Sequence, residues 1–567
     1  MRTFRDPPAA ALAQLPEING IRRSDVRARA AYAEGAGIYR LLPTAVAVPS
    51  TTAALRALVA WASKHRVPLV PRGAGSGMTG GNVGRGVVVD LTALDGCPLR
   101  LHPGVRRART GAGVTHGALA LKAGEHGLRL PPDPSSSRFA TLGGMVSTNA
   151  AGARSVAHGS VRRWVEAIDV VTADGEILPL RRGVEPPSTA SVVRFRDEAE
   201  PAIRAKAALI RERFPRTRKN SSGFALDEWL ESGDLLDLFV GAEGTLGFVT
   251  EIEWRLAPVP AHRAGIRAAL RELDSIAPAV RSLLSLDPSA LEYLDATFLE
   301  FAAAELERSG QRMPAGADGG VLLVEFEADS AGDLATRLRA AEAMLAPLAV
   351  ELRSAVEDRG VDALWDIRHA ASPILARLGE QRRSMQVIED GCVPIPALAG
   401  YITAVRGAAT RHGVTAVLFG HAGDGHLHVN LLPDTTAAGW EQRVAGMYRE
   451  VSDAVLALGG TPAGEHGDGR LRVPLVSRLY GDEIVELFRM VKAAFDPHGL
   501  LNPEVKLPGP DPGNGSPLAG LKVGSGAARI PEDIERGLRD IERGARYSID
   551  RLELADAFYT LRPEAPS

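Results

Sequence analysis

The sequence predicts an α+β protein built from at least two sizeable domains. Its 567 residues are more than one hydrophobic core usually organises, and 45% hydrophobic with 24% charged residues is ordinary for a globular chain. Helical and strand-like patterns alternate through the first part, and Pro258 and Pro260 mark a change of character. We therefore expect one domain to end near residue 260 and a second domain to follow it.

The first domain is expected to alternate helices with buried strands. Ser50 and Thr51 can cap a helix that carries a regularly spaced apolar face, and residues 67–70 have the pattern of a short buried strand. Thr115 is placed to cap a further helix. Residues 181–200, rich in proline, serine, arginine and glutamate, are expected to form an exposed excursion.

The second domain is expected to be a sheet covered by helices on one side. Residues 268–310 have a helical pattern, residues 321–326 an apolar strand pattern, and residues 331–345 the pattern of an Ala/Leu-rich helix. The proline- and glycine-rich residues 508–515 predict a linker. The charged residues 530–554 are predicted to form one weakly amphipathic helix that packs on the protein itself rather than on a membrane.

Charge and composition exclude several classes of function. The 66 basic and 69 acidic residues leave a net charge of -3, which gives no electrostatic case for nucleic-acid binding. Met1–Pro7 precedes no signal-like apolar stretch, and no run of 18 apolar residues follows, so we expect a cytoplasmic protein or one peripheral to a membrane. The two cysteines, Cys97 and Cys392, are too few for a disulfide framework or an iron–sulfur cluster, and each is expected to be buried.

The most informative motif is a glycine-rich loop within residues 70–81. Glycine admits positive φ and leaves no Cβ in the way, so successive N–H groups can turn inward and bind an anion such as phosphate. Gly75, Gly77 and Gly80 have the spacing of a dinucleotide fingerprint, but the strand-like residues 87–91 follow where that fingerprint needs a helix. A nicotinamide-type Rossmann site is therefore excluded. A phosphate-binding loop and a plain tight turn both stay open.

Two further glycine-rich segments follow in order, residues 141–152 after a proline-rich run and residues 241–250. The order and spacing of the three loops resemble the FAD-binding domain of the vanillyl-alcohol oxidase and p-cresol methylhydroxylase flavoprotein family over about residues 31–260. The resemblance implies a two-subdomain domain in which the first loop wraps the pyrophosphate, the second lies along the flavin and the third closes the site. Because the first loop has no histidine, the resemblance implies a non-covalent FAD.

The same resemblance implies which positions bind the cofactor. Asn502 belongs to a closing motif of the family and could either contact the flavin or only end a helix. The implied cofactor-binding residues are Pro71, Arg72, Gly73, Gly75, Ser76, Gly77, Thr79, Gly80, Pro132, Gly143, Gly144, Ser147, Asn149, Gly152, Glu243, Gly244 and Asn502.

Chemistry-bearing residues of the second domain concentrate in residues 420–430 and 464–469. Several histidines and acids in so small a span suit a divalent metal, since imidazole and carboxylate together fit Zn or Mn. His426 and His428 lie two apart in a strand-like segment and should face the same way. Gly-Asp-Gly turns beside strands are also common without a metal, so satisfied polar histidines remain an alternative.

These two segments are similar to the C-terminal domain of the flavin-linked D-2-hydroxy-acid dehydrogenases, a group that includes D-lactate, glycolate and D-2-hydroxyglutarate dehydrogenases. The resemblance implies that His421, His428 and Glu465 are metal ligands and that His466 is the catalytic acid/base. His426 stands where asparagine is usual, and could add a ligand or only a hydrogen bond.

Arg368 lies in a segment that resembles the one whose arginine binds the substrate carboxylate. A planar guanidinium can do so bidentately, and Ser372, one helical turn on, would share its face as a substrate-binding residue. The hydroxyglutarate enzymes have a lysine soon afterwards, but residues 387–391 contain none, which puts the contact to a distal carboxylate in question. The pattern is closer to a bacterial branch whose longer members append an iron–sulfur domain.

Together the two resemblances divide the chain into four parts. These are an N-terminal extension, 1–30; a FAD-binding domain, 31–260; a FAD-linked oxidase C-terminal substrate and metal domain with an antiparallel sheet, 261–505; and a linker with a helical tail, 506–567.

The function that follows is oxidation of a small D-2-hydroxy acid to the 2-oxo acid by hydride transfer to FAD, assisted by a divalent metal. Electrons would pass to a separate acceptor, such as an iron–sulfur subunit, an electron-transfer flavoprotein or a quinone, with residues 530–554 as a candidate docking surface. Two alternatives come from other classes. One is an oxygen-using FAD alcohol or sugar oxidase, and the other is a metal- or nucleotide-binding scaffold without redox chemistry.

Overall fold

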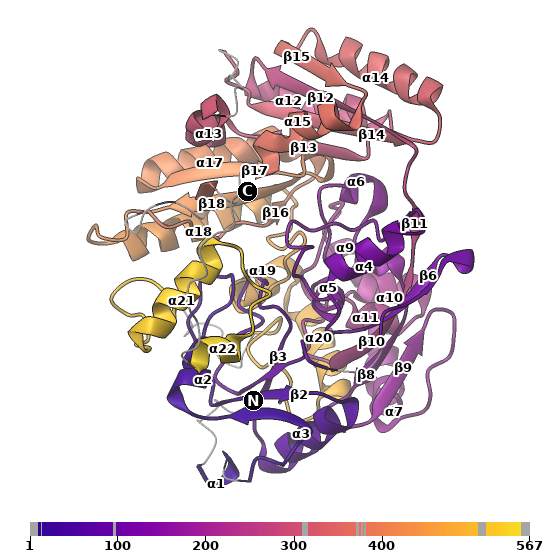
Figure 1. Cartoon of the computed structure of the whole chain (residues 1–567), viewed down its shortest axis with the longest axis vertical. Coiled ribbons are helices and arrows are strands. Elements are labelled where there is room, and N and C mark those ends of the chain that lie inside the picture. The colour runs from indigo at the N-terminus through magenta and orange to yellow at the C-terminus, as the bar shows by residue number, and fades with distance from the viewer. Residues whose placement is uncertain are drawn as a thin grey trace.

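The computed structural model describes residues 9–12, 14–94, 98–308, 316–369, 374–375, 378, 382–508 and 518–556. Figure 1 shows the first domain in the lower half of the view and the second domain in the upper half. Both contain helices and antiparallel strands, so the predicted α+β class is confirmed. Within the described ranges, no helix is both long and apolar enough to cross a membrane.

A four-stranded sheet begins the first domain. The helices and strands of this part of the chain are α1 Ala9–Leu12, β1 Gly20–Arg23, α2 Val26–Ala31, β2 Ala45–Pro49, α3 Thr52–His65, β3 Leu69–Arg72 and β4 Val87–Asp90. The strand order is β1-β2-β4-β3, with β2 and β3 parallel to β4 and with β1 antiparallel to β2. Thr51 caps α3 as predicted, whereas the strand expected over residues 67–70 begins at Leu69.

A five-stranded antiparallel sheet completes the first domain, in the order β5-β6-β10-β8-β9, and Thr115 caps α4 as predicted. The helices and strands of this part of the chain, in which β7 and β11 form a separate pair, are β5 Arg100–His102, β6 Arg107–Gly111, α4 His116–Gly124, β7 Leu128–Arg129, α5 Leu142–Thr148, α6 Ser155–His158, β8 Val165–Val171, β9 Ile177–Arg181, α7 Ala190–Arg194, α8 Glu200–Ala205, α9 Ala207–Arg213, α10 Leu226–Ser232, α11 Leu236–Phe239, β10 Phe248–Arg255 and β11 Ala257–Pro258.

The exposed excursion expected over residues 181–200 is wrong for its second half. Helices begin there, and Val192, Phe195 and Ala199 are buried. Their spacing puts them on one helical face, where the ring of Phe195 packs 5.7 Å from that of Phe495. The prediction was based on the polar composition of the segment and overlooked these three apolar residues at helical spacing.

A seven-stranded antiparallel sheet forms the second domain, in the order β15-β12-β14-β13-β17-β18-β16. Its strands are β12 His262–Leu270, β13 Ala290–Leu294, β14 Val321–Ala328, β15 Ala349–Ala355, β16 Gly391–Cys392, β17 Thr415–Gly420 and β18 His426–Leu432. The strand predicted at residues 321–326 is confirmed as part of β14. The helix predicted over residues 268–310 is wrong, because that range contains the end of β12 and all of β13 as well as helices.

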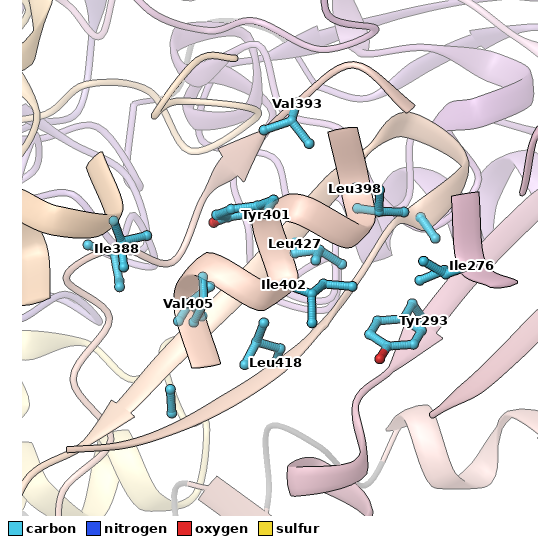
Figure 2. Close-up of a cluster of buried hydrophobic side chains, with 14 of the residues drawn as sticks. Ile276, Tyr293, Ile388, Val393, Leu398, Tyr401, Ile402, Val405, Leu418 and Leu427 are labelled. Carbon is cyan, nitrogen blue, oxygen red and sulfur yellow. The ribbon is translucent and has the colours of Figure 1, made fainter. Parts of the chain in front are cut away.

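Helices cover both faces of this sheet, rather than the one face predicted. α12 Ile276–Leu284, α14 Ala331–Leu345, α17 Leu398–His412 and α18 Trp440–Ala457 share a core with one face, and α13 Ala296–Arg308 and α15 Asp358–His369 share a core with the other. Figure 2 shows Tyr401, Ile402 and Val405 of α17 over Leu418 of β17 and Leu427 of β18. The helix predicted at residues 331–345 is confirmed as α14.

The chain then returns to the first domain. α19 Val473–Tyr480 and α20 Asp482–Phe495 pack in the same core as α9, α10 and β10. The last described segment forms two helices, α21 Glu532–Arg543 and α22 Arg551–Ala555, so the single helix predicted over residues 530–554 is wrong. They pack on the protein itself, beside α2 at the left of Figure 1. Cys392 is buried as expected, whereas Cys97 and most of the predicted linker, residues 509–515, lie outside the described residues.

Candidate active site

The first glycine-rich loop leaves β3 and runs along the wall of a large cavity. Gly75 and Gly80 have φ values of 77° and 80°, which other residues rarely adopt. In the described part of the chain, no backbone N–H group from Gly73 to Gly81 donates a hydrogen bond to a protein acceptor. A row of N–H groups without acceptors beside a cavity fits a bound anion, and therefore fits the pyrophosphate of FAD.

The second and third loops close on the first. Thr141 caps α5 through a hydrogen bond from the Gly144 N–H, which fixes the second loop at the cavity wall. In the third loop Gly244 has a φ of 70°, and a Cβ added there would stand 2.3 Å from Pro71 Cγ. Glycine at position 244 thus lets the third loop lie directly against the first.

One cavity of about 1140 Å³ joins these loops to the histidine cluster of the second domain. It exceeds the roughly 300–1,000 Å³ of a single small-molecule site, and so has room for a dinucleotide and a small acid. The predicted cofactor-binding residues on its wall are Pro71, Arg72, Gly73, Gly75, Ser76, Gly77, Thr79, Gly143, Gly144, Ser147, Gly152, Glu243 and Gly244. Those placed off the wall are Gly80, Pro132, Asn149 and Asn502.

Two of the residues off the wall, Asn149 and Asn502, make contacts that shape the loops. Asn149 ends α5 with a φ of 53°, and its Oδ1 accepts from the Arg162 N–H at 3.2 Å. The Asn502 amide donates to the carbonyls of Gly81 and Glu243, each at 2.8 Å, and so joins the first loop to the third. These two contacts give Asn502 a loop-fixing role, but its Oδ1 is buried without a hydrogen-bond partner in the described residues, so the flavin contact stays a prediction.

Glu243 connects the third loop to the second histidine motif. Its buried carboxylate accepts from the N–H groups of Asp468 and Gly469 at 2.8 and 3.0 Å, and Lys506 lies 3.3 Å away. These contacts hold the third glycine-rich loop and the 464–469 segment in a fixed position relative to each other.

Three predicted metal ligands form a small triangle of donor atoms. His421 Nε2 lies 3.2 Å from Glu465 Oε1 and 3.4 Å from His428 Nε2, and His428 Nε2 lies 3.5 Å from Glu465 Oε1. Two ligand atoms about 2.1 Å from one ion stand about 3.0–3.4 Å apart at tetrahedral or octahedral angles. The spacing therefore fits one divalent cation.

The tautomers of the two histidines support the same conclusion. His428 Nδ1 donates to the Glu389 carbonyl at 3.0 Å, so in the neutral ring Nε2 presents a lone pair to the triangle. His421 Nδ1 bonds the Glu292 carboxylate in the same way. Outer partners of this kind fix the ring orientation of metal-binding histidines.

Glu465 is kept ionised and oriented by Lys219. The Lys219 ammonium bonds Glu465 Oε2 at 2.7 Å and leaves Oε1 to the triangle. Burial opposes the charge on each group, but the pairing outweighs it. The pKa of Glu465 is thus lowered well below its usual range, and that of Lys219 is raised.

His426 lies beside the triangle, and its ring nitrogen is close enough to the donor atoms of His421, His428 and Glu465 to be a fourth candidate ligand as well as a hydrogen-bonding group. Its Nε2 bonds Asp390 Oδ1 at 2.8 Å, and its Nδ1 lies 3.4 Å from the Lys219 ammonium. Burial lowers the pKa of His426 to about 4, so the ring is neutral. Its place in strand β18 is as predicted.

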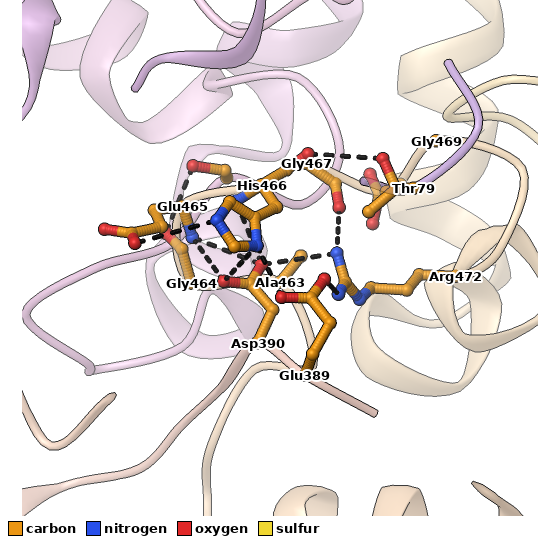
Figure 3. Close-up of polar contacts among 12 residues, drawn as sticks. Thr79, Glu389, Asp390, Ala463, Gly464, Glu465, His466, Gly467, Gly469 and Arg472 are labelled. Atoms are coloured by element: carbon orange, nitrogen blue, oxygen red, sulfur yellow. Dashed lines mark hydrogen bonds and ion pairs between the residues drawn. The ribbon is translucent and has the colours of Figure 1, made fainter. Parts of the chain in front are cut away.

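His466 lies beside the triangle and is held by an acidic pair (Figure 3). Its ring Nδ1 bonds Glu389 Oε2, and its backbone N–H donates to Asp390 Oδ2 at 3.0 Å. Arg472 forms ion pairs with both carboxylates. Burial disfavours the imidazolium, but Glu389 and Asp390 outweigh it and raise the pKa of His466 to about 9. The Thr79 hydroxyl donates to the His466 carbonyl at 3.2 Å, which joins this residue to the first loop.

Arg368 lies on the same cavity wall. Its Nε donates to Glu292 Oε2 at 2.7 Å, and its guanidinium lies 4.8 Å from the centre of the Phe419 ring. Among the described residues, only Glu292 accepts from this guanidinium, so the Nη groups can bind a ligand carboxylate. Ser372, predicted to share its face, lies outside the described residues.

Sequence reasoning missed the residues that hold the predicted ones in place. Glu292 is fully buried in the apolar strand β13, and a glutamate inside such a run is a signal that could have revealed it. Lys219 lies in a polar loop far from the histidines in sequence and gives no such signal. The missed set is Lys219, Glu292, Glu389, Asp390 and Arg472.

Comparisons with known families assign the two halves of the site. The family described as "FAD binding domain" matches residues 43–181, and the one described as "FAD linked oxidases, C-terminal domain" matches residues 259–505. The first match contains the first two loops, and the second contains the histidine cluster and Arg368. Loops, cavity and matches define an FAD-dependent oxidoreductase.

Relatives of similar length extend this assignment. Glycolate oxidase subunit GlcD of Bacillus subtilis (strain 168) is 30% identical over 476 residues, which is 82% of this chain and 89% of that protein. D-lactate dehydrogenase of Archaeoglobus fulgidus is 28% identical over 459 residues, covering 81% and 90%. The chain belongs to the family of FAD-linked oxidases. It matches D-2-hydroxyglutarate dehydrogenase of Pantoea ananatis at 29% identity, but spans 48% of that longer protein.

Solved structures confirm the predicted two-domain fold. 4-Ethylphenol oxidase from Gulosibacter chungangensis aligns with a TM-score of 0.65 at 17% identity, covering 88% of this chain and 97% of that one. p-Cresol methylhydroxylase aligns with a TM-score of 0.60 at 14% identity, covering 86% and 93%. At these identities the likeness shows the fold alone.

Proposed function

We propose that this chain is a dehydrogenase that oxidises a D-2-hydroxy acid of the D-lactate, glycolate or D-2-hydroxyglutarate class to the 2-oxo acid. The observation that carries the proposal is the single cavity, whose wall holds the N–H row of the first loop, the donor triangle and Arg368. The names of the relatives support the same substrate class.

Arg368 orients the substrate by its carboxylate. A guanidinium binds a carboxylate bidentately, which fixes direction as well as charge. Arg368 and His421 share the two oxygens of Glu292, so the carboxylate-binding group and the donor triangle are held at a fixed separation. A 2-hydroxy acid carries its hydroxyl one carbon from its carboxylate, and so can reach both.

His466 is the proposed base and takes the hydroxyl proton at Nε2, since its Nδ1 is bonded to Glu389. Because its pKa is raised to about 9, only the neutral ring can accept this proton, and kcat/KM should rise as the pH approaches about 9. This Nε2 lies 3.8 Å from Glu465 Oε1, which puts the base beside the donor triangle. Glu389 and Asp390 then stabilise the positive charge that the ring gains.

A metal and FAD, when bound, would supply the remaining chemistry. His421, His428 and Glu465 would hold a divalent cation such as Zn or Mn, which would supply a Lewis acid of the kind that lowers the pKa of bound water from 15.7 to about 7. FAD, held along the glycine-rich loops, would supply the acceptor for the hydride from C2. The protein contributes the geometry that brings the reacting atoms together.

Electrons are proposed to leave through a separate acceptor, such as an iron–sulfur subunit, an electron-transfer flavoprotein or a quinone. The sequence holds two cysteines, whereas an iron–sulfur cluster generally takes four thiolates. We expect fast turnover with artificial electron-accepting dyes and slow turnover with oxygen, measured as substrate-dependent dye reduction and oxygen uptake on one preparation.

The alternative function is an oxygen-using FAD alcohol or sugar oxidase. Oxygen uptake as fast as dye reduction, with one peroxide formed per substrate, would favour it and remove the need for a partner. The donor triangle argues against it, because a cation beside Arg368 suits a hydroxyl next to a carboxylate better than an isolated alcohol.

A further inference from the structure

The C-terminal segment, residues 518–556, lies after both family matches and docks on the first domain. Its ion pairs include Arg27 with Asp533 at 2.6 Å and Arg40 with Glu535 at 2.8 Å. The residues of α21, α22 and the turn between them that are buried against α2, β2, β3 and β4 are Ile534, Leu538, Ile541, Tyr547, Leu552, Leu554 and Ala555. The segment is therefore an integral part of the fold.

The last two residues of α21 and the turn after it, together Glu542–Tyr547, line the cavity that holds the cofactor loops. Glu542 anchors the start of this stretch, since it bonds Lys522 at 2.8 Å and lies 3.5 Å from Arg383 of the second domain. Ala545 has a φ of 48°, a left-handed conformation that costs energy in a residue with a Cβ and that is often found at ligand-binding positions.

The turn faces the first glycine-rich loop. The Tyr547 ring lies 5.2 Å from that of Phe139, and Ala74 and Met78 of the first loop pack against the same apolar cluster as Tyr547. This loop carries the N–H groups that have no protein acceptor.

Positive charge gathers at and behind the turn. Arg546 is half-buried on the cavity wall, and no ion pair from the described part of the chain reaches it. The guanidinium of Arg551 lies 5.7 Å from the centre of the Tyr547 ring; Arg551 is 5% exposed, and in the described residues its Nε and Nη1 have no hydrogen-bond partner. Arg72, on the cavity wall, is 2% exposed. Cations opposite a row of free N–H groups favour a ligand with more than one negative charge.

We infer that the turn Glu542–Tyr547 forms part of the FAD site and that Arg546 binds the pyrophosphate of the cofactor. The inference concerns cofactor binding alone, and so does not depend on the substrate or the metal. It adds to the site a residue that lies outside both family matches.

The test is the FAD dissociation constant, measured from the flavin fluorescence released when holoprotein is diluted. Arg546→Ala should raise this constant about tenfold or more, as expected for loss of one charge-assisted hydrogen bond, and Arg546→Lys should raise it less. Arg536→Ala, an exposed position on α21, removes the same charge from the same segment and should leave the constant unchanged.

Two competing ligands locate the contact. ADP, which carries the pyrophosphate without the flavin, should lose affinity for Arg546→Ala by the same factor as FAD, whereas riboflavin, which has no phosphate, should not. An FAD constant within twofold of that of Arg536→Ala overturns the inference. So does an equal loss of riboflavin affinity, or a change confined to the KM of the acid.

Discussion

Replacing His421 or His428 by alanine should abolish turnover while FAD stays bound. Each histidine supplies one corner of the donor triangle, and neither contacts the glycine-rich loops through a hydrogen bond. Loss of a Lewis acid costs several kcal/mol of transition-state stabilisation, or a fall in kcat of about a thousandfold or more. The measurement is dye-linked turnover together with the flavin and metal content of each purified variant.

His412→Ala is the matched control, because His412 bonds Glu450 away from the cavity and should keep full activity. A strong chelator should reproduce the loss in the unchanged protein, and added Zn or Mn should reverse it. The metal role is wrong if chelation and both substitutions leave the rate within about twofold.

Arg368→Lys should lower kcat/KM by one to two orders of magnitude. Lysine keeps the charge but loses the planar pair of donors, and a charge-assisted hydrogen bond contributes about 1.5–3 kcal/mol. The 2.7 Å hydrogen bond from Arg368 Nε to Glu292 is lost as well. The distance between the group that binds the substrate carboxylate and the donor triangle is then no longer fixed. Steady-state kinetics with the preferred acid, at matched FAD and metal content, measures the effect.

Arg353→Lys on the exposed strand β15 controls for the exchange itself and should have no effect. If Arg368→Lys matches Arg353→Lys in kcat/KM, another group binds the carboxylate.

Short motifs predicted the site better than periodicity predicted the second domain. The three loops and two histidine segments carry their chemistry in residue type and spacing, and the structure brings Gly75, Gly244, His421 and Glu465 to one cavity. The helix predicted over residues 268–310 failed because alanine and leucine fit either structure. Pairing of β12 with β14 and β15, and of β13 with β14 and β17, then decides in favour of strands.

The contacts that could not be predicted join residues that are far apart in the sequence. Lys219 reaches Glu465 across the domain boundary, and Glu292 joins Arg368 to His421 from a strand between them. Neither contact has a local pattern. The break between α21 and α22 was also missed, although Gly544 after Arg543 is a local helix-end signal and Asp550 before Arg551 is a local helix cap.

Anaerobic reduction of the bound FAD tests the central claim most directly. Holoprotein is mixed without oxygen with D- and L-enantiomers of small 2-hydroxy acids and with glycolate, before chelation, after it, and after Zn or Mn is restored. The account predicts bleaching of the flavin absorbance by at least one D-acid or by glycolate, loss of bleaching on chelation, and recovery with metal. Bleaching by a simple alcohol or a sugar but by no 2-hydroxy acid, unchanged by chelation, would contradict it.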